Sequence, residues 1–289
     1  MSAASHRPDS IRFTKMNGAG NDFVVLDNRG YGFSDDELSF LAKRLCPRRT
    51  GIGADGLLAL NSADESDHDY RMRYFNADGS PATMCGNGAR CLARFALAMG
   101  VGWGELLVDS DAGTYRVDEG ESGRMQLQME VPKEPVEVDP EARSETGLDP
   151  DHPVYQVWAG TEHVVIFVDE ADAVPVEPWG RALRNDPLFA PEGTNVNFVE
   201  VEEPSDGGVR IRVRTYEKGV EAETLACGTG AIASAWATFR LRASEARRVA
   251  VEVGGGTLGV HWDGLNPDHV VLEGDAEIVY EGRVEIDWD

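Results

Sequence analysis

The motif Cys-Gly-x-Gly-Ala occurs twice in this chain, beginning at Cys85 and at Cys227. Each copy follows a strand-like run and leads into an apolar run with helical character. This context places a cysteine on a glycine turn at a helix N-terminus, where unpaired backbone N–H groups and the helix dipole stabilise negative charge. One such cysteine suggests a nucleophile. Two matched ones suggest an acid and a base that face each other across a cleft.

The same order of elements surrounds both motifs. A helix is expected over 34–45, where Ser34 and Glu37 form a capping signal, and the helices after the cysteines are expected over 89–99 and 231–241. A Gly-Gly-Gly turn predicts a hairpin of 249–253 with 257–262. Further strands are expected within 11–27 on either side of a glycine turn, and at 70–75, 106–108, 114–117, 125–131, 156–168, 195–201 and 209–216. Each half therefore combines many short strands with one long apolar helix, which predicts a tandem duplication of an α+β unit with a cleft between the halves.

The length of 289 residues is sufficient for two domains. The segment 132–153 is rich in Pro, Glu and Asp and is the best candidate for a linker. We therefore expect an N-terminal domain over 1–129 that carries Cys85, and a C-terminal domain over 130–275 that carries Cys227.

Composition narrows the class of protein. A hydrophobic content of 42% is typical of a globular chain. The first ten residues are polar and show no targeting signal, and the longest apolar run is broken by Arg94 and by several glycines, so no membrane span is expected. Four cysteines are too few for a disulfide framework. These features favour a cytoplasmic location.

The charge balance is strongly acidic, with 51 acidic against 27 basic residues and a net charge of −24. Such self-repulsion burdens a fold at low ionic strength, whereas molar salt shortens the Debye length to roughly 3 Å and screens it. The composition therefore indicates adaptation to a high-salt cytoplasm. Nucleic acid is disfavoured as a partner because no basic stripe is present.

Other motifs do not predict a nucleotide or metal site. The G-x-G-x-x-G match at 51–56 follows no strand, and the related match at 228–233 lacks the acidic residue that a dinucleotide fold needs. The cysteines show no zinc spacing, and the calcium-like run that begins at Asp109 has glycine where the bidentate glutamate is required. The acidic run 64–69 is interpreted as a solvated hairpin loop. Cys46 and Cys91 are interpreted as structural residues.

Several motifs together resemble those of diaminopimelate epimerases. They are Met-Asn-Gly-Ala-Gly-Asn-Asp-Phe at 16–23, Gly-Ile-Gly-Ala-Asp-Gly at 51–56, Phe-Asn-Ala-Asp-Gly-Ser at 75–80, Met-Cys-Gly-Asn-Gly-Ala-Arg-Cys at 84–91, Asn-Val-Asn-Phe at 195–198, Tyr-Glu-Lys-Gly at 216–219 and Ala-Cys-Gly-Thr-Gly at 226–230. They occur in the order and spacing of that family. The resemblance implies an α+β fold of two pseudo-symmetric domains, each a strand-rich curled sheet around a central helix. It also implies that C-terminal strands, at about 276–289, return to the first domain.

The resemblance further implies roles for individual residues. Cys85 and Cys227 correspond to the acid/base pair. Substrate-binding positions correspond to Asn21, Asn76, Asn195 and Glu217. The backbone N–H groups that hold the carboxylate of the reacting centre correspond to those of Gly86, Asn87, Gly228 and Thr229.

The chain departs from the family pattern at three places. A glutamine that is frequent in the family is Gly56 here, and the family's Gly-Asn-Pro-His is Gly160-Thr161-Glu162-His163, so that Thr161 replaces a substrate-binding asparagine. The usual Glu-Arg-Gly contains Lys218, which cannot form the bidentate fork that arginine makes with a carboxylate. Gly56, Thr161, His163 and Lys218 remain candidate binding positions for the far end of the substrate.

The implied chemistry follows from the weak acidity of an amino acid's α-hydrogen. Preorganised N–H donors can stabilise the developing carbanion, at about 3–4 kcal/mol for a donor of this kind in other enzymes. Inversion needs a base on one face and an acid on the other, and a thiolate and a thiol can exchange these roles. We therefore expect an isomerase that converts LL- to meso-diaminopimelate for lysine biosynthesis, with no pyridoxal phosphate or other cofactor and no metal.

Two alternatives remain open at this point. One is a racemase that resembles proline racemase, which also uses two cysteines, and the other is a non-catalytic binding protein with the same fold. The expected partner is a small-molecule substrate, with neither nucleic acid nor membrane, and a homodimer is possible by analogy.

Overall fold

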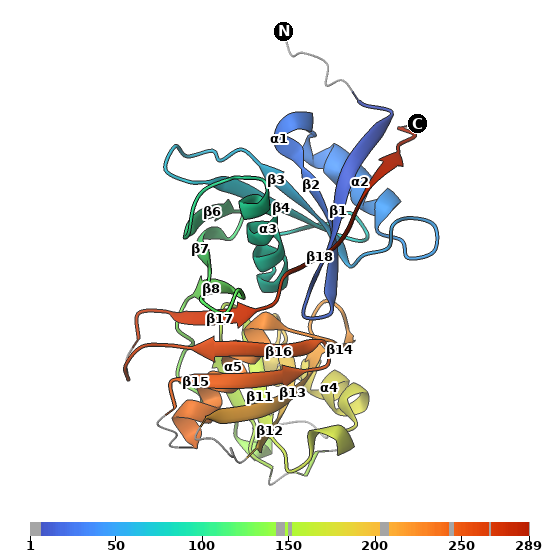
Figure 1. Ribbon diagram of the computed structural model, residues 1–289. Helices are drawn as coiled ribbons and strands as arrows, with labels where there is room; N and C mark the ends of the chain where they lie inside the picture. The colour runs from blue at the N-terminus through green and yellow to red at the C-terminus, as the bar shows by residue number, and fades with distance from the viewer. Residues whose placement is uncertain are drawn as a thin grey trace. The chain divides into compact units, whose positions relative to one another are not determined.

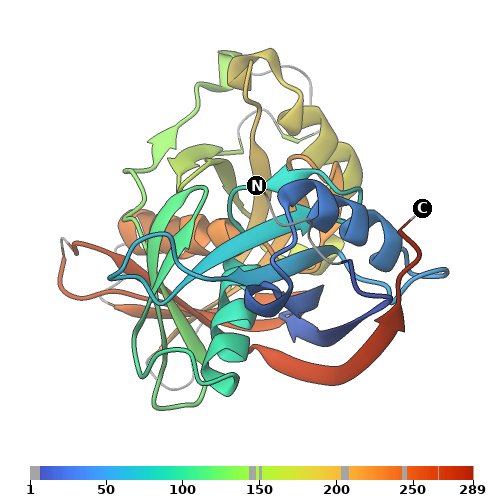
Figure 2. The same ribbon diagram turned by 90° about the horizontal axis from the view of Figure 1, so that it is seen from above.

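The structure is a computed structural model that describes residues 7–142, 148–149, 152–202, 208–242, 246–265 and 267–288. The chain forms two compact units, one comprising residues 1–127 and 274–289 and the other residues 128–273. Figures 1 and 2 show the two units in perpendicular views. In the described part of the chain, no helix is long and apolar enough to cross a membrane.

The first unit contains a mixed sheet and three helices. Its strands are β1 (Ser10–Gly18), β2 (Asn21–Asp27), β3 (Gly56–Asn61), β4 (Tyr70–Asn76), β5 (Pro81–Ala82), β6 (Leu106–Ser110), β7 (Gly113–Glu119), β8 (Met125–Met129) and β18 (Glu277–Glu285). Its helices are α1 (Asn28–Tyr31), α2 (Asp35–Leu45) and α3 (Gly86–Ala98). β18 pairs antiparallel with β1, and the two ribbons lie side by side in both views (Figures 1 and 2).

The second unit contains β9 (Val136–Glu137), β10 (Tyr155–Trp158), β11 (Glu162–Phe167), β12 (Asn195–Glu202), β13 (Val209–Glu217), β14 (Ala222–Thr224), β15 (Arg248–Val253), β16 (Gly256–His261) and β17 (Val270–Gly274). Its helices are α4 (Val176–Arg184), α5 (Gly228–Leu241) and the short 3₁₀ turns η1 (Pro140–Ala142), η2 (Ala171–Ala173) and η3 (Pro187–Phe189).

The two units repeat one strand topology. In the first, β1 and β2 are antiparallel, β2 and β3 parallel, β3 and β4 antiparallel, and β4 and β6 parallel. In the second, the same sequence of orientations joins β10 to β11, β11 to β12, β12 to β13, and β13 to β15. The predicted duplication of an α+β unit is therefore confirmed, and with it the expected fold class.

The cysteine helix of each unit is enclosed by that unit's own strands. α3 packs against β1, β2, β3, β4, β7 and β18, and α5 packs against β10, β11, β12, β13, β15 and β16. Residues 230–239 of α5 are all buried. This burial explains why α5 is apolar on every side rather than amphipathic.

A second helix covers the opposite face of each sheet. In the first unit, Val24 and Leu26 of β2 share a core with Leu38 and Leu41 of α2, while the neighbouring Phe23 and Val25 are equally buried. The continuous apolar run of β2 follows from this two-sided cover. α2 begins after Ser34, whose hydroxyl accepts from the Glu37 N–H while the Glu37 carboxylate accepts from the Ser34 N–H. The predicted capping box is confirmed.

Some predictions from sequence were wrong in detail. The segment 132–153 does not behave as a linker in its described part, because β9 pairs with β10 and Val138 is buried in the core of the second unit. Residues 143–147 and 150–151 of that segment lie outside the described residues. α3 and α5 begin three residues earlier than expected, directly after the cysteines. The sequence reasoning also missed α4, whose Val176 and Leu183 face the core of the second unit.

Candidate functional site

Cys85 occupies the N-cap position of α3, as the glycine motif predicts. Its backbone is extended, with φ −146° and ψ 118°, and helical geometry begins at Gly86. The first N–H groups of α3 have no acceptor within the helix, so they remain available for an anion close to the thiol. Cys227 is the N-cap of α5 in the same way, with φ −118° and ψ 111°.

The Asn21 amide contacts the Cys85 sulfur, and the Asn87 amide contacts Asn21 in turn. Cys85 Sγ donates to Asn21 Oδ1 at 3.5 Å, and Asn87 Nδ2 donates to the same oxygen at 3.4 Å. Asn21 is presented at the start of β2 by a two-residue turn in which Ala19 has φ 55° and Gly20 has φ 84°. Positive φ at both central residues is the geometry that the right-handed twist of a hairpin favours. The structure therefore brings together three of the predicted site residues in the first unit.

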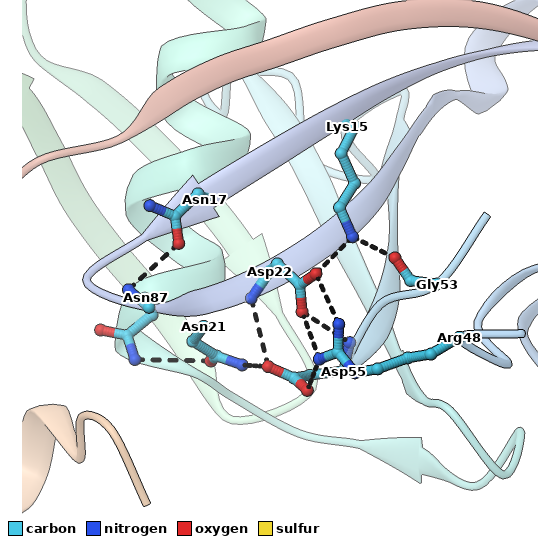
Figure 3. Close-up of polar contacts among 9 residues, drawn as sticks. Lys15, Asn17, Asn21, Asp22, Arg48, Gly53, Asp55 and Asn87 are labelled. Carbon is cyan, nitrogen blue, oxygen red and sulfur yellow. Dashed lines mark hydrogen bonds and ion pairs between the residues drawn. The ribbon is translucent and has the colours of Figure 1, made fainter. Parts of the chain in front are cut away.

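A network of paired charges holds Asn21 in place (Figure 3). Asn21 Nδ2 donates to Asp55 Oδ2 at 2.7 Å, so the amide oxygen is the atom that faces Cys85. Asp22 and Asp55 exchange backbone-to-carboxylate hydrogen bonds at 3.2 Å. Arg48 donates to both carboxylates, at 2.8 Å to Asp22 and 2.6 Å to Asp55. The side chain of Lys15 approaches Asp22 at 2.5 Å and also donates to the Gly53 carbonyl.

Within this network the Asp22 carboxyl keeps its negative charge over a wide pH range. Burial raises the pKa of the Asp22 carboxyl, but the hydrogen bonds from Arg48 and Lys15 outweigh it and hold the pKa at about 2. By contrast, burial raises the pKa of the Cys46 and Cys91 thiols to about 12, so both stay neutral. Neither thiol is accessible, since Cys46 is 1% exposed and Cys91 0%.

Asn76 and Gly56 lie opposite each other in the first unit, as a pair between β4 and β3. Asn76 Nδ2 donates to Ser80 Oγ at 3.0 Å within the turn that follows β4. Gly56 leaves no room for a side chain, since a Cβ there would lie 2.5 Å from Tyr74 Cε2 and 2.7 Å from the Phe75 carbonyl oxygen. The ring of Tyr74 thus excludes the glutamine that the related motifs carry.

Replacing Gly56 with alanine should therefore destabilise the protein. We expect a loss of about 1–3 kcal/mol in the free energy of unfolding, measured by denaturant titration, because an overpacked site forces its neighbours to shift. The control is Gly30→Ala, since a Cβ at Gly30 meets nothing within 4 Å. Adding Tyr74→Ala to Gly56→Ala should cost less than the sum of the two single changes. A Gly56→Ala variant as stable as Gly30→Ala would show that the ring does not fill this space.

In the second unit the sulfur of Cys227 faces a hydroxyl rather than an amide. Cys227 Sγ and Thr229 Oγ1 are 3.6 Å apart, and either group can donate. Asn195, at the start of β12, accepts from the Lys218 N–H at 2.9 Å and donates to the Glu162 carbonyl at 3.0 Å. The Glu217 carboxylate accepts from Thr224 Oγ1 at 2.7 Å. Gly228 is the first residue of α5 and directly follows Cys227.

The departures from the family pattern in the second unit contact one another. Glu162 Oε2 accepts from Lys218 Nζ at 2.7 Å and from Thr161 Oγ1 at 3.1 Å. Although partial burial opposes it, the hydrogen bond from Lys218 lowers the pKa of the Glu162 carboxyl. The ammonium of Lys218 is therefore paired with Glu162 within its own unit. Lys218 and Glu162 together replace the arginine and the proline of the related motifs. The sequence reasoning missed Glu162, which stands where the related motif has proline.

His163 is buried rather than presented to a ligand. It is 0% exposed, and its Nδ1 lies 3.1 Å from Asn197 Nδ2, which makes Nδ1 the acceptor. Burial lowers the pKa of His163 to about 3, and the charge of Lys218 acts in the same direction. The imidazole is therefore neutral near pH 7. Its other nitrogen, Nε2, has no hydrogen-bond partner in the described part of the chain.

The sequence reasoning also missed the network that holds Asn21. Lys15, Asp22, Arg48 and Asp55 come from three separate segments, and only Asp22 and Asp55 lie within the quoted motifs. Within the ranges that the structure describes, no group of three or more His, Cys, Asp or Glu side chains is arranged to hold a metal ion.

Known proteins share this sequence pattern along nearly the whole chain. A family model described as diaminopimelate epimerase matches residues 13–134 and 155–279. The diaminopimelate epimerase of Methanocella arvoryzae is 40% identical over 288 residues, covering 96% of this chain and 98% of that protein. That of Aquifex aeolicus is 37% identical over 287 residues, covering 95% and 98%.

Solved structures with lower identity share the fold. A phenazine biosynthesis protein of the PhzF family from Bacillus anthracis superposes with a TM-score of 0.74 at 18% identity, covering 96% of this chain and all of that one. A probable proline racemase from Agrobacterium radiobacter gives a TM-score of 0.64 at 16% identity, covering 96% and 93%. At such identities the likeness concerns the fold alone, whereas the family follows from the near full-length match at 37–40% identity. The chain belongs to the diaminopimelate epimerase family.

Proposed function

We propose that this protein epimerises LL-diaminopimelate to meso-diaminopimelate, a step of lysine biosynthesis. The observation that carries the proposal is the repeated Cys-Gly-x-Gly turn. Both copies place a cysteine at the N-cap of a buried helix, in a chain that matches the family over nearly its full length. A binding protein on this fold would have no need for both thiols.

Cys85 and Cys227 are the proposed acid and base. One thiolate removes the α-hydrogen of the substrate, and the thiol of the other cysteine delivers a proton to the opposite face, so that the configuration at the α-carbon inverts. The reverse reaction exchanges the two roles. Backbone N–H groups of Gly86, Asn87, Gly228 and Thr229 hold the carboxylate on which negative charge develops, as expected of helix N-termini.

The polar side chains around each cysteine are proposed to bind the substrate. In the first unit these are Asn21 and Asn76, and in the second they are Asn195 and Glu217. Lys218 is paired with Glu162 and cannot form the bidentate hydrogen bonds that an arginine makes with a carboxylate. We therefore propose that the far end of the substrate is bound by single hydrogen bonds and by this ion pair. Thr161 donates to Glu162 and is proposed to bind the same end of the substrate. His163 is buried, which favours a structural role next to these residues rather than contact with the substrate.

The reaction is proposed to need no pyridoxal phosphate. Such chemistry requires a lysine whose amine is free to form a Schiff base. The chain has lysine only at positions 15, 43, 133 and 218, and of these Lys15 and Lys218 are engaged in ion pairs with Asp22 and Glu162. Electrostatic stabilisation by the helix N-termini takes the place of the cofactor's electron sink.

The proposed setting is a cytoplasm of high salt concentration, which the net charge of −24 supports. A homodimer is the proposed assembly. Its support is the outer strand β18, which pairs with β1 and leaves Ile278, Val279 and Tyr280 between 42% and 54% exposed. Consecutive exposed apolar residues on a strand favour association with a second copy.

Isotope labelling tests the two-base reaction. With LL-diaminopimelate in D₂O, we expect deuterium in the product from the first turnover, because the thiol that returns a proton carries solvent deuterium. Substrate recovered early should remain mostly protiated, since its own face is served by the other cysteine. Mass spectrometry of both epimers at low conversion measures this difference, with L-proline as the control substrate. Transfer of the original hydrogen to the product would contradict the two-base proposal, and turnover of L-proline alone would contradict the proposed substrate.

A further inference from the structure

Arg90, in the first turns of α3, is among the largest fully buried side chains of the protein. Its guanidinium donates to Asn87 Oδ1 at 2.8 Å and to the Gly86 carbonyl at 3.4 Å. Nε of Arg90 has no hydrogen-bond partner among the described residues. A guanidinium presents five N–H donors, so this one is poorly satisfied for a group that water does not reach.

The charge of Arg90 is also uncompensated. No carboxylate in the described part of the chain forms an ion pair with it, and the first turn of α3 contains no acidic residue. Asp275, a carboxylate whose charge acts on Arg90, is itself paired with Arg124 at 3.1 Å. A cation near a helix N-terminus is further opposed by the helix dipole. A fold would not retain such a group without an anion to offset it.

The thiolate of Cys85 is the anion that the local chemistry offers. Burial lowers the pKa of the Arg90 guanidinium, and charge on Cys91 or Cys85 opposes that effect. The Cys91 thiol stays neutral because burial raises its pKa to about 12. Cys85, which is only partly buried, is therefore the remaining candidate.

Two groups act on the Cys85 sulfur in opposite directions. Asn21 Oδ1 accepts the S–H hydrogen bond and so favours the neutral thiol. Arg90 donates to Asn87 Oδ1, and its positive charge interacts with Cys85 and so favours the thiolate. An acid/base residue must hold a proton in one half of the reaction and release it in the other, so a balance of this kind suits the role.

The repeat supplies an internal comparison. The position that corresponds to Arg90, five residues after the second cysteine, is Ile232, which is 1% exposed. The second copy thus carries an apolar side chain where the first carries a buried cation. The fold of the helix turn therefore does not require a charge at this place.

We propose that Arg90 is a positioning residue that stabilises the thiolate form of Cys85 and orients the Asn87 amide toward Asn21. The role assigned to Cys85 rests on the proposed function. The ionisation of its thiol, however, can be measured without substrate.

Most other charged side chains near α3 are exposed or form ion pairs with other residues. On the strands that pack against this helix, the charged side chains of β18 and that of Arg12 on β1 are exposed, and several of the others form ion pairs of their own. These pairs are Lys15 with Asp22, Arg71 with Asp109, Arg73 with Asp111, and Arg94 with Glu119. Arg90 is thus the charged group whose removal should change Cys85 most.

The test is the pH dependence of alkylation, followed for each cysteine by peptide mapping after exposure of the substrate-free protein to iodoacetamide. In Arg90→Met we expect the pKa of Cys85 to rise by about one unit, the low end of the effect of a nearby opposite charge. Alkylation of Cys85 below that pKa should slow about tenfold, which is the rate equivalent of one pH unit. In Asn21→Ala the pKa of Cys85 should move the other way, and Cys227 serves as the internal reference in every sample.

Arg94→Met is the matched control, because Arg94 lies one turn later on α3 and pairs with Glu119 at 2.9 Å. It should leave the alkylation profile of Cys85 unchanged. A folded Arg90→Met or Arg90→Gln protein with the wild-type profile would overturn the proposal, even if the protein is an active epimerase. If neither variant folds, the alkylation profile of the wild-type protein is the test. The proposal then requires that Cys85 has a lower pKa than Cys227. Failure of the epimerase assay alone would count against the proposed function and leave this result standing.

Discussion

Replacing either Cys85 or Cys227 with alanine should abolish epimerisation. Inversion requires a group that removes a proton on one face and a group that returns one on the other, so a protein with one thiol can complete only half of the reaction. Each acid or base contributes about 10²–10⁴-fold to rate in other enzymes, and we expect kcat to fall by at least ~10³ in each variant. The measurement is the appearance of meso-diaminopimelate from the LL-isomer, with circular dichroism to verify that the variants fold.

Serine variants refine this expectation. A hydroxyl is a far weaker acid than a thiol, so Cys85→Ser and Cys227→Ser should retain only traces of activity although their shape is nearly unchanged. Cys46→Ala and Cys91→Ala are the controls, because both thiols are buried and burial raises the pKa of each to about 12. They should keep turnover while losing some stability. Near-normal turnover in either alanine variant at position 85 or 227 would end the two-base proposal.

Much of the fold could be predicted because local signals in the sequence agree with the tertiary structure. Ser34 and Glu37 predict the start of α2, and the capping box forms as expected. The two Cys-Gly-x-Gly turns predict helix N-termini, and both helices begin directly after the cysteine. Such signals depend on residues within one turn of each other, so the chain far away does not alter them.

The parts that could not be predicted depend on contacts between distant segments. Arg90 and Arg94 stand one turn apart on α3, yet the first is fully buried and the second is paired with Glu119 at the surface. Nothing local distinguishes them. In the same way, the ion pair of Lys218 with Glu162 joins the turn after β13 to the first residue of β11, and the sequence showed each only as a departure from a motif. Tertiary packing decides such cases.

For the segment 132–153, composition predicted a linker where the structure has packed residues. Its proline and acidic residues are typical of a linker, and composition was the basis of that interpretation. Val138 nevertheless contributes to the core of the second unit, and Val136–Glu137 pairs with β10. Leu148 belongs to the same core, so a few apolar residues anchor a segment that is otherwise rich in proline and acidic residues.

Stability should rise steeply between dilute buffer and 2 M KCl. The chain carries 51 acidic and 27 basic residues, so even if every cation is paired, 24 negative charges remain to repel one another. Salt shortens the Debye length from about 10 Å at 0.1 M to about 3 Å at 1 M and removes most of this repulsion. We expect the apparent Tm to increase by about 10 °C or more, which corresponds to roughly 6 kcal/mol for 289 residues at about 2.1 cal/mol/K of unfolding entropy per residue. Differential scanning calorimetry over a KCl series measures it.

Screening also weakens attractive pairs, and the balance between the two effects makes the prediction informative. Many arginines are in ion pairs that are partly exposed, such as Arg116 with Glu105, and an exposed pair is worth only about 0–1 kcal/mol. The pair of Lys15 with Asp22 is more buried and is screened less. Loss of the exposed pairs therefore offsets little of the gain from reduced repulsion. The sign of the salt effect should follow the excess of acidic residues.

Two controls separate screening from other effects of salt. Glycerol at concentrations that raise the Tm of ordinary proteins should not reproduce the steep dependence, because it does not screen charge. A triple variant, Glu65→Gln, Asp67→Asn and Glu121→Gln, removes three exposed negative charges of the first unit. It should be more stable than the wild type in dilute buffer and should gain less from KCl, so that the two proteins converge at high salt. A Tm that does not change with KCl, or a triple variant with the wild-type slope, would contradict the view that charge repulsion limits this fold at low ionic strength.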